Sequence, residues 1–202
     1  MDRNSSVIRA ETLAMLEAYI PLSQEEACDQ RLTLAYAREY PETVLLRENE
    51  IAHITSSGFI VNATCDRVLM VHHNLRNTWA WTGGHADGEN DLLGVAVREA
   101  WEEAGIVAAP ETGEIAGIDI LYMPRHMRRG CYVNTHLHLN ISYILVANEH
   151  APLTVNPDEN TAVRWFREGE IASPCFGEGD VASYKRLLAR AKYDANMKRN
   201  RA

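Results

Sequence analysis

The chain has 202 residues, of which 46% are hydrophobic, and a formal net charge of −8 at pH 7. This length fits one domain with extensions, and the hydrophobic content is ordinary for a protein that buries a core. A general nucleic-acid binder would carry a basic face, so the charge argues against a nucleic-acid polymer as a partner. An acidic protein that handles an anionic substrate needs a metal bridge or a local basic patch.

The first residues, 1–9, are polar, and no apolar run reaches the roughly 18 residues that a membrane span needs. We therefore expect neither a signal peptide nor a membrane anchor, and we expect a cytoplasmic location. The four cysteines lie far apart and form no C-x-x-C pair (Cys28, Cys65, Cys131 and Cys175). This spacing indicates neither a zinc site among them nor a disulfide scaffold, so we expect reduced and mostly buried thiols.

Two helices are predicted ahead of the main fold. Residues 11–19 carry apolar side chains at helical spacing, and Pro21 ends this first helix. Ser23 is a typical N-cap with a glutamate, Glu26, three residues on, and it opens a second helix that ends near Tyr40. Residues 1–50 thus form an N-terminal helical extension. It either packs against the rest of the chain or forms the surface of a homodimer.

From residue 52 the pattern becomes that of strands. Residues 52–61 and 67–73 are rich in strand-forming residues and are separated by a turn, which predicts a hairpin. Residues 79–82 predict a further short strand with Trp79 and Trp81 on one face. Either ring could stack on a nucleobase, although large aromatic side chains beside a sheet more often belong to the core.

A glycine loop at residues 83–88 leads into a helix that begins at Asp91 and that Gly105 closes as a C-cap. Apolar residues recur along it at threes and fours, the period of one buried face. Three glutamates share another face, which we expect to be exposed: Glu99, Glu102 and Glu103. Carboxylates this close resist joint ionisation unless a cation neutralises them. Oxygen ligands favour Mg²⁺ or Mn²⁺ for that purpose.

This loop and helix resemble the Nudix box, a signature of hydrolases that cleave nucleoside diphosphates linked to another moiety. The box asks for Gly, five residues, Glu, seven residues, and then Arg-Glu-apolar-any-Glu-Glu-any-Gly-apolar. Seven positions match: Gly84, Arg98, Glu99, Glu102, Glu103, Gly105 and Ile106. Asn90 stands where the first Glu belongs, and Ala100 is a small version of the apolar residue. In the family that Glu mainly pairs with the arginine of the helix, and Glu89 could substitute for it.

The resemblance implies a fold, a reaction and a metal site. The fold is the Nudix α/β/α sandwich with a mixed β-sheet, here over residues 51–170. The reaction is metal-dependent hydrolysis of the pyrophosphate bond in a nucleoside diphosphate linked to another moiety, or in a similar diphosphate compound. The three box glutamates would hold Mg²⁺ or Mn²⁺ with the Gly83 carbonyl. Arg98 would orient the helix and loop through an ion pair, for which Glu89 is a candidate partner.

The resemblance also implies a further carboxylate from the loop ahead of the strand at residues 162–166. By position, Glu159 is the first choice and Asp158 the second, as a metal ligand or general base. A linker and a helix over about 180–195 complete the C-terminal part, residues 171–202, whose basic tail we expect to be frayed.

Several residues outside the box are candidates for contact with substrate. Residues 114–123 and 132–146 predict strands flanking a basic loop, whose arginines (Arg125, Arg128 and Arg129) could grip a terminal phosphate. A solvated hairpin tip is the alternative interpretation of this loop. His136 and His138 alternate and leave the same sheet face as Asn140. A metal pair is one interpretation of these histidines, and a polar pocket wall is the favoured one. His85 and Trp81 are further candidates beside the glycine loop.

Two other functions compete with hydrolysis. A degenerate Nudix domain that senses a ligand is one, because Asn90 departs from the box. An isomerase of the isopentenyl diphosphate type on the same fold is the other. It would need a cysteine near the box, and the chain has none between Cys65 and Cys131. The sequence does not rank nucleoside triphosphates, nucleotide sugars, dinucleoside polyphosphates and coenzyme-like pyrophosphates as substrates.

Overall fold

A computed structural model describes residues 6–128, 130–172 and 175–200. Seven strands form a central sheet, and two further strands form a separate hairpin. The strands are β1 Ala52–Val61, β2 Arg67–His73, β3 Thr78–Ala80, β4 Thr82–His85, β5 Ala108–Met123, β6 His126–Arg128, β7 Cys131–Val133, β8 His136–Ala147 and β9 Asn160–Arg167. The helices are α1 Ala10–Ala18, α2 Gln24–Glu39, α3 Leu92–Ala104 and α4 Glu178–Arg199, and a 3-10 turn spans Glu168–Ala172.

The sheet is mixed because β1 and β8 run parallel while the other pairings are antiparallel. The path of strands is β3-β2-β1-β8-β5, and β9 adds to β2. β1 pairs with β4 over residues 55–58 and with β2 over residues 60–61. Two different strands therefore follow one another along the same side of β1.

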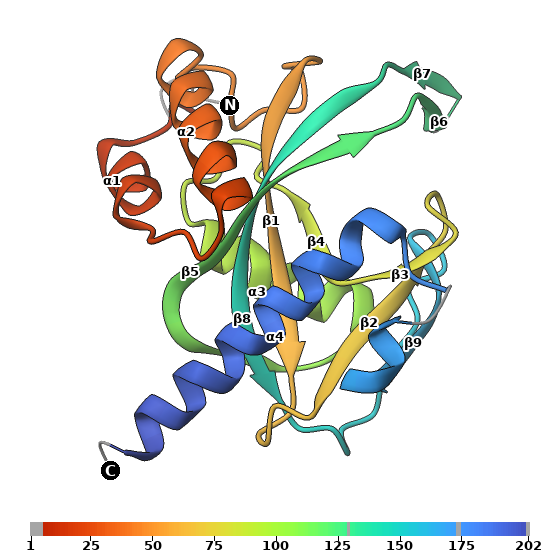
Figure 1. Ribbon diagram of the computed structural model, residues 1–202. Coiled ribbons are helices and arrows are strands. Elements are labelled where there is room, and N and C mark those ends of the chain that lie inside the picture. The colour runs from red at the N-terminus through yellow and green to blue at the C-terminus, as the bar shows by residue number, and fades with distance from the viewer. Residues whose placement is uncertain (1–5, 129, 173–174, 201–202) are drawn as a thin grey trace.

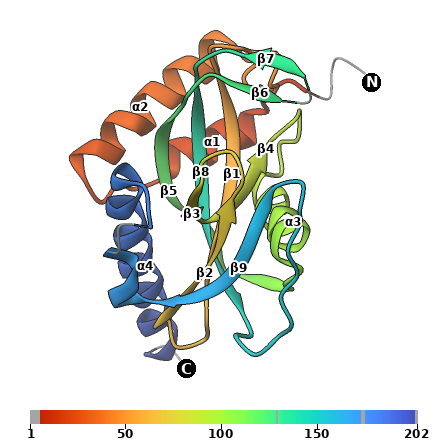
Figure 2. The same ribbon diagram turned by 90° about the vertical axis from the view of Figure 1, so that its right-hand side faces the viewer.

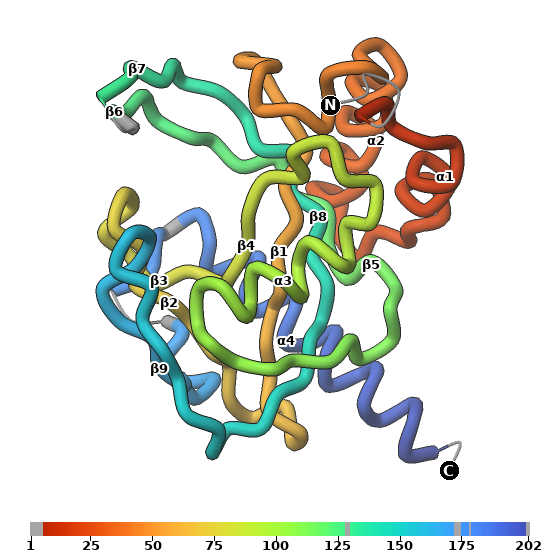
Figure 3. The backbone as a smooth tube through the Cα atoms, turned by 180° about the vertical axis from the view of Figure 1, so that it is seen from behind, coloured from red at the N-terminus to blue at the C-terminus, as the bar shows by residue number. Residues whose placement is uncertain are grey.

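Helices cover both faces of this sheet. α4 lies in front of the strands in Figure 1, and α3 lies in front of them when the molecule is seen from behind in Figure 3. Figure 2 shows the sheet between the two helices. Tyr184, Leu187 and Leu188 bury the inner face of α4 against Phe59 and its neighbours. The predicted α/β/α sandwich with a mixed sheet is confirmed.

The N-terminal helices pack against this fold. Ser23 caps α2 as predicted, since its hydroxyl accepts a hydrogen bond from the Glu26 backbone N–H at 3.1 Å. Leu16, Leu34 and Ala37 join the same apolar core as the inner face of α3. Packing of the described part of the extension, residues 6–50, against the core is thus observed, while the homodimer surface stays a prediction.

Several predicted boundaries are wrong. The strand predicted from residue 114 starts at Ala108, and residues 83–85 of the predicted glycine loop belong to β4. The predicted strand over 79–82 is divided because β3 pairs with β2 and β4 with β1, and the chain changes partner at Trp81. The predicted loop and strand over 124–146 instead contain the hairpin β6–β7 before β8. β8 starts at His136, which pairs with Met123 at the end of β5. α4 remains helical to Arg199, as Lys198 pairs with Glu111 at 3.0 Å.

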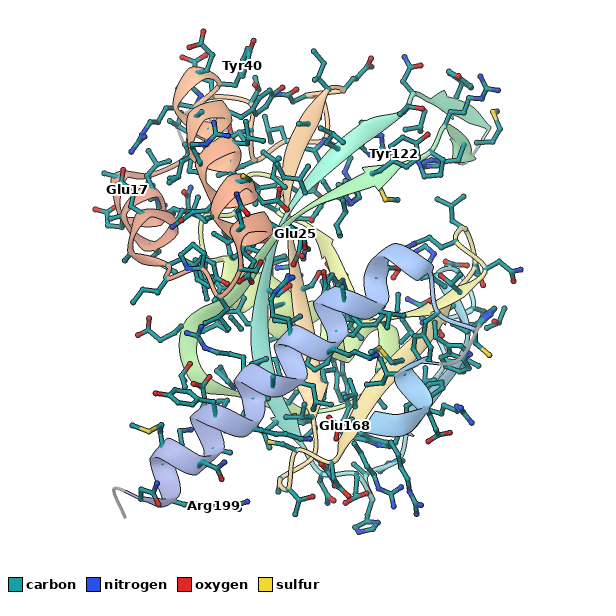
Figure 4. All side chains as sticks on the ribbon, viewed as in Figure 1. Glu17, Glu25, Tyr40, Tyr122, Glu168 and Arg199 are labelled. Atoms are coloured by element: carbon teal, nitrogen blue, oxygen red, sulfur yellow. The ribbon has the colours of Figure 1, made fainter. Side chains whose placement is uncertain are left out.

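The cysteines are free, as expected, but only Cys65 is buried. The other three lie at exposed positions, so the expectation of mostly buried thiols is wrong. β5 and β8 carry the hairpin away from the sheet, and Tyr122 near its base is exposed (Figure 4). Within the described residues, no helix is long and apolar enough to cross a membrane.

Candidate active site

The acidic helix α3 is held at both ends by its own sequence. The Asp91 side chain caps its start by accepting from the Gly94 N–H at 2.9 Å. Gly105 ends it in the left-handed conformation at φ 64°, where its N–H donates to the Trp101 carbonyl. The predicted apolar face is buried at Leu92, Val95, Ala96, Ala100 and Ala104. These contacts fix which side of the helix faces β4.

That side carries Glu99 and Glu103, so the predicted exposed stripe is wrong for two of the three glutamates. Glu103 is 4% exposed, whereas the side chains of Glu99 and Glu102 are 13% and 50% exposed. Glu99 and Glu103 are one helical turn apart and both turn toward β4, while Glu102 lies toward solvent. A Cβ on Gly84 would lie 2.4 Å from the Glu99 carboxylate, so only glycine leaves room for it there.

Glu159 completes a group of three carboxylates. Oxygen atoms of Glu99, Glu103 and Glu159 all lie within 4.8 Å of one another, close enough to hold one metal ion. Asn160, at the start of β9, donates from its amide to the Glu103 carbonyl at 2.8 Å and so ties this loop to the end of α3. Glu102 is not part of this group and lies 3.6 Å from Arg98.

The electrostatics of the group fit a divalent cation. Burial, with Glu102 and Glu159 adding to it, raises the pKa of Glu99 to about 7. Burial also raises the pKa of Glu103 well above its usual range, although the Gly83 N–H opposes this by donating to its carboxylate at 3.2 Å. Crowded carboxylate oxygens are the ligands that Mg²⁺ and Mn²⁺ prefer. The residues present therefore fit the predicted type of ion.

Arg98 makes the ion pair that was expected, since it donates to Glu89 at 2.7 Å. Asn90 has a different set of contacts. Its side-chain oxygen accepts from the Arg9 N–H at 2.8 Å and from the Thr12 hydroxyl at 2.9 Å, and its amide donates to the Val7 carbonyl at 3.0 Å. The residue that departs from the box thus joins the glycine loop to the N-terminal extension.

β4 separates the carboxylates from a group of histidines. Gly84 faces α3, whereas a Cβ on Gly83 would meet the Ser57 hydroxyl on the opposite face. The His85 ring lies on that opposite face, with its centroid 5.0 Å from those of His53 and His138. Residues from both groups line one cavity of about 1060 Å³. We call the carboxylate side of this cleft the acidic wall and the other side the histidine wall.

The register of the sheet builds the histidine wall. His53 of β1 lies directly opposite His138 of β8, and Thr55 lies opposite Asn140. His136 and His138 share one face as predicted, and their Nε2 atoms are 3.1 Å apart. Asn140 lines the cleft beside these histidines. Its side-chain oxygen accepts hydrogen bonds from the hydroxyls of Thr55 at 3.1 Å and Ser57 at 2.7 Å.

The other candidates for substrate contact are placed less favourably. Trp81 is 7% exposed and packs edge-on against Tyr184, with ring centroids 4.9 Å apart, so most of it belongs to the core. Arg125 is exposed between β5 and β6 and does not line the cleft. Arg128 lies in β6, and Arg129 lies outside the described residues.

Sequence reasoning missed three residues that line the cleft: His53, Arg47 and Arg76. Arg47 pairs with Asp87 and Arg76 with Asp180, so neither guanidinium lacks a carboxylate partner. A signal for His53 was present, because His53, Thr55 and Ser57 are polar residues that alternate on one face of the strand. No comparable local pattern marks the two arginines.

Comparison with known proteins agrees with this geometry. The model of the NUDIX domain family matches residues 52–187. None of the curated proteins matches the chain. Among solved structures, the chain is similar to the MutT protein of Methanosarcina mazei Go1 at 20% identity and a TM-score of 0.53, covering 71% of this chain and 98% of that one.

Two further structures are similar at the level of the fold. A NUDIX hydrolase from Nitrosomonas europaea has 18% identity and a TM-score of 0.51, covering 69% of this chain and 89% of its own. An Ap4A hydrolase of C. elegans has 14% identity and a TM-score of 0.51, covering 67% of this chain and 95% of its own. Because the family model spans residues 52–187, the chain belongs to the Nudix family, and it is a Nudix pyrophosphohydrolase as its loop-helix motif predicted.

Proposed function

We propose that the protein hydrolyses the pyrophosphate bond of a nucleoside diphosphate linked to another moiety, or of a similar small diphosphate compound, and that it needs Mg²⁺ or Mn²⁺ to do so. The observation that carries the proposal is the convergence of Glu99, Glu103 and Glu159 beside Gly83 and Gly84. Arg98 lies 4.0 Å from Glu99, but three buried or crowded carboxylates remain costly together, and a divalent cation offsets that cost.

Each residue of the acidic wall has a role in this proposal. Glu99, Glu103 and Glu159 would hold the ion, with the Gly83 carbonyl beside them and Glu102 at the solvent side. Bound there, a divalent cation would offset the charge of the phosphate groups and make the attacking water more acidic. A carboxylate of this set takes the proton from that water, with Glu159, the most exposed of the three, as our first choice. Arg98 positions the helix against the loop through Glu89.

The rest of the cleft would receive the substrate. Its volume of about 1060 Å³ is large enough for a nucleotide-sized molecule. His85, His136 and His138 form the opposite wall, which supports the prediction that they face the substrate. Trp81 is largely buried but lines the cleft, and its contact with substrate remains a prediction, as do the contacts of Arg125 and Arg128. The hairpin places Met127 and Tyr132 on the cleft, so this element can contact bound substrate.

The alternative function, a ligand sensor without catalysis, rested on Asn90. The contacts of Asn90 with residues 7–12 give this departure a structural reason that does not involve the carboxylates. All carboxylates of the predicted metal site are present. A specific observation in favour of the sensor is therefore lacking among the described residues, and we retain it only as an outcome of the test.

We also propose a cytoplasmic location and a homodimer. Three exposed free cysteines fit a reducing compartment, which supports the first. Ile20, Leu22 and Leu32 are 74%, 53% and 46% exposed on the helical extension, and apolar residues of this kind support the second. Light scattering of the purified protein distinguishes a dimer from a monomer.

The experiment that tests the function is a release assay for phosphate and pyrophosphate over the four substrate classes, with Mg²⁺ or Mn²⁺. The wild type is compared with Glu99→Gln, Glu103→Gln and Glu102→Gln. Turnover that needs metal and that disappears in the first two variants would support the hydrolase. A folded wild type that binds diphosphate compounds equally well with and without a chelator, and that releases no product, would instead support the sensor.

A further inference from the structure

The histidine wall has a feature that the hydrolase proposal does not use. The rings of His53, His136 and His138 gather so closely that one ligand nitrogen from each lies within 4.8 Å of the others. Each pair of rings has centroids 5.0 to 5.1 Å apart. His53 and His136 are 3% and 7% exposed, so this is a buried cluster with one side on the cleft.

Hydrogen bonds fix which nitrogen of two rings is free to bind. The Nδ1 atom of His53 lies 2.9 Å from the Asn49 carbonyl, and that of His136 lies 2.8 Å from the Asn134 carbonyl. A carbonyl only accepts, so both Nδ1 atoms carry the proton and both Nε2 atoms keep a lone pair. This is the arrangement that orients metal-binding histidines in proteins, where the second nitrogen donates to a backbone carbonyl.

The Nε2 atoms make few hydrogen bonds with the rest of the protein. The Nε2 atom of His53 is buried without a hydrogen-bond partner in the described structure. A buried acceptor in that state is unfavourable and calls for a ligand. The Nε2 atom of His136 accepts a hydrogen bond from the Nε2–H of His138 at 3.1 Å, and a metal ion that binds both nitrogens would replace this bond. Burial first, and then the neighbouring histidines, lower the pKa of His138 to about 2, so its ring is neutral and cannot hold an anion by charge.

We propose that His53, His136 and His138 form a second metal site, which takes a divalent transition metal such as Zn²⁺ through three imidazole nitrogens. Imidazole ligands select zinc and its neighbours over Mg²⁺, whereas the acidic wall offers only oxygen. All three histidines line the cleft, and three protein ligands leave a fourth coordination position open. It can be filled by water or by an oxygen atom of a bound substrate.

The two metal sites are separate in structure. The carboxylates contact β4 from the side of α3, and the histidines lie on the other face of that strand. Occupation of one site can therefore be measured without the other. Binding of a transition metal can also be observed without substrate, so its failure would leave the hydrolase proposal untouched.

The test is a titration of the metal-free full-length protein with Co²⁺ in the presence of excess Mg²⁺, followed by visible absorption. Four-coordinate Co²⁺ absorbs far more strongly than the six-coordinate ion, so a nitrogen site and an oxygen site give different spectra. We expect one equivalent of strongly absorbing Co²⁺, which Zn²⁺ displaces, in the wild type and in Glu103→Gln. Weak absorption typical of six-coordinate Co²⁺ alone in the wild type would overturn the proposal.

Matched variants locate the site. His136→Gln removes one ligand and is expected to weaken Co²⁺ binding at least ~100-fold, since even loss of a partner behind a ligand costs about 10–100-fold. His126→Gln is the control, because its ring lies 6.3 Å from His136 on the same cleft but outside the cluster. Equal binding by wild type and His136→Gln, or equal loss in both variants, would contradict the assignment.

His136 is buried, so the folding of its variant is checked by near-ultraviolet circular dichroism. A second measurement does not depend on any variant. X-ray absorption of the Zn²⁺-loaded wild type is expected to show three imidazoles at about 2.0–2.1 Å. A first shell made of oxygen alone would overturn the proposal.

Discussion

The two walls of the cleft are assembled in different ways. The acidic wall takes Glu99 and Glu103 from a single helical turn and adds Glu159 from the loop before β9. The histidine wall takes its side chains from β1, β4 and β8, which are joined only by sheet pairing. A local motif can therefore specify one wall, whereas the other exists only once the strands are in register.

The walls also differ in charge. Burial and mutual repulsion raise the pKa values of Glu99 and Glu103, so the acidic wall is unfavourable without a cation. Burial lowers the pKa values of His53 and His138, which favours the neutral form of these two rings. One wall attracts a hard cation by charge, and the other offers lone pairs to a softer one.

The largest expected effect comes from Glu99→Gln. The amide keeps the shape but removes one charge from the three-carboxylate group, so metal-dependent turnover should fall on the order of 10³-fold, several kcal/mol of lost stabilisation. Steady-state assays at saturating Mg²⁺ measure this. Co²⁺ binding to the histidine wall should not change, which sharpens the distinction between the walls. Glu114→Gln, an exposed site on β5, is the control, and an equal loss there would refute the assignment.

Gly84→Ala probes the point where the walls meet. The added Cβ would lie 2.4 Å from the Glu99 carboxylate, which must move away. A displacement of about 1 Å in an active site can cost about 10²-fold in rate. Turnover is again the measurement. Gly179→Ala has open space around its Cβ and should leave turnover unchanged. If Gly84→Ala retained full activity, the close approach of β4 to Glu99 would not matter for catalysis.

The sequence predicted the acidic wall better than the histidine wall for a physical reason. Spacing along a helix determines which side chains are neighbours, so the box alone predicts that Glu99 lies beside Glu103. It could not show that Glu103 would be buried, because burial depends on how β4 packs against α3. Similarly, alternation placed His136 beside His138, but the contribution of His53 depends on the parallel register of β1 and β8.

The ends of the helices and strands also show that local sequence predicts local contacts only. Caps at Ser23 and Gly105 are local and were predicted correctly, whereas Asp91, predicted as the first residue of its helix, is its N-cap. The change of partner at Trp81 and the division of β7 from β8 depend on which strand lies alongside, and these were missed. Asn90 was identified as a departure from the box, yet its contacts with residues 7–12 span more than 75 positions of sequence and leave no local pattern.

Asn90→Glu tests that interpretation by restoring the residue that the box expects. A carboxylate cannot donate to the Val7 carbonyl and is longer than the amide, so its hydrogen bonds to the extension should be lost. At about 1 kcal/mol for each bond, we expect the free energy of unfolding to fall by ~2 kcal/mol, with no gain in turnover. Urea unfolding measures the change, and Asn90→Asp, which keeps the acceptor, should lie in between. Higher turnover with unchanged stability would show that Asn90 weakens catalysis.

The smallest expected effect is a gain in stability, which concerns only the acidic wall. Glu103→Gln should stabilise the metal-free protein by about 1 kcal/mol at neutral pH, because it removes a buried carboxylate while keeping an acceptor for the Gly83 N–H. The pKa of Glu103 is raised in the folded protein, so the contribution of this carboxyl group to wild-type stability is most favourable at low pH and falls as pH rises.

The advantage of Glu103→Gln should therefore grow from about pH 5 upward and vanish below it, where both states of the wild type are protonated. Thermal unfolding in the presence of a chelator measures it. Excess Mg²⁺ should reverse the order, because only the wild type gains stability from the ion. The same substitution should not alter Co²⁺ bound at the histidine wall. A variant less stable than the metal-free wild type at pH 8 would mean that the carboxylate of Glu103 stabilises the fold without a bound cation, which contradicts this prediction.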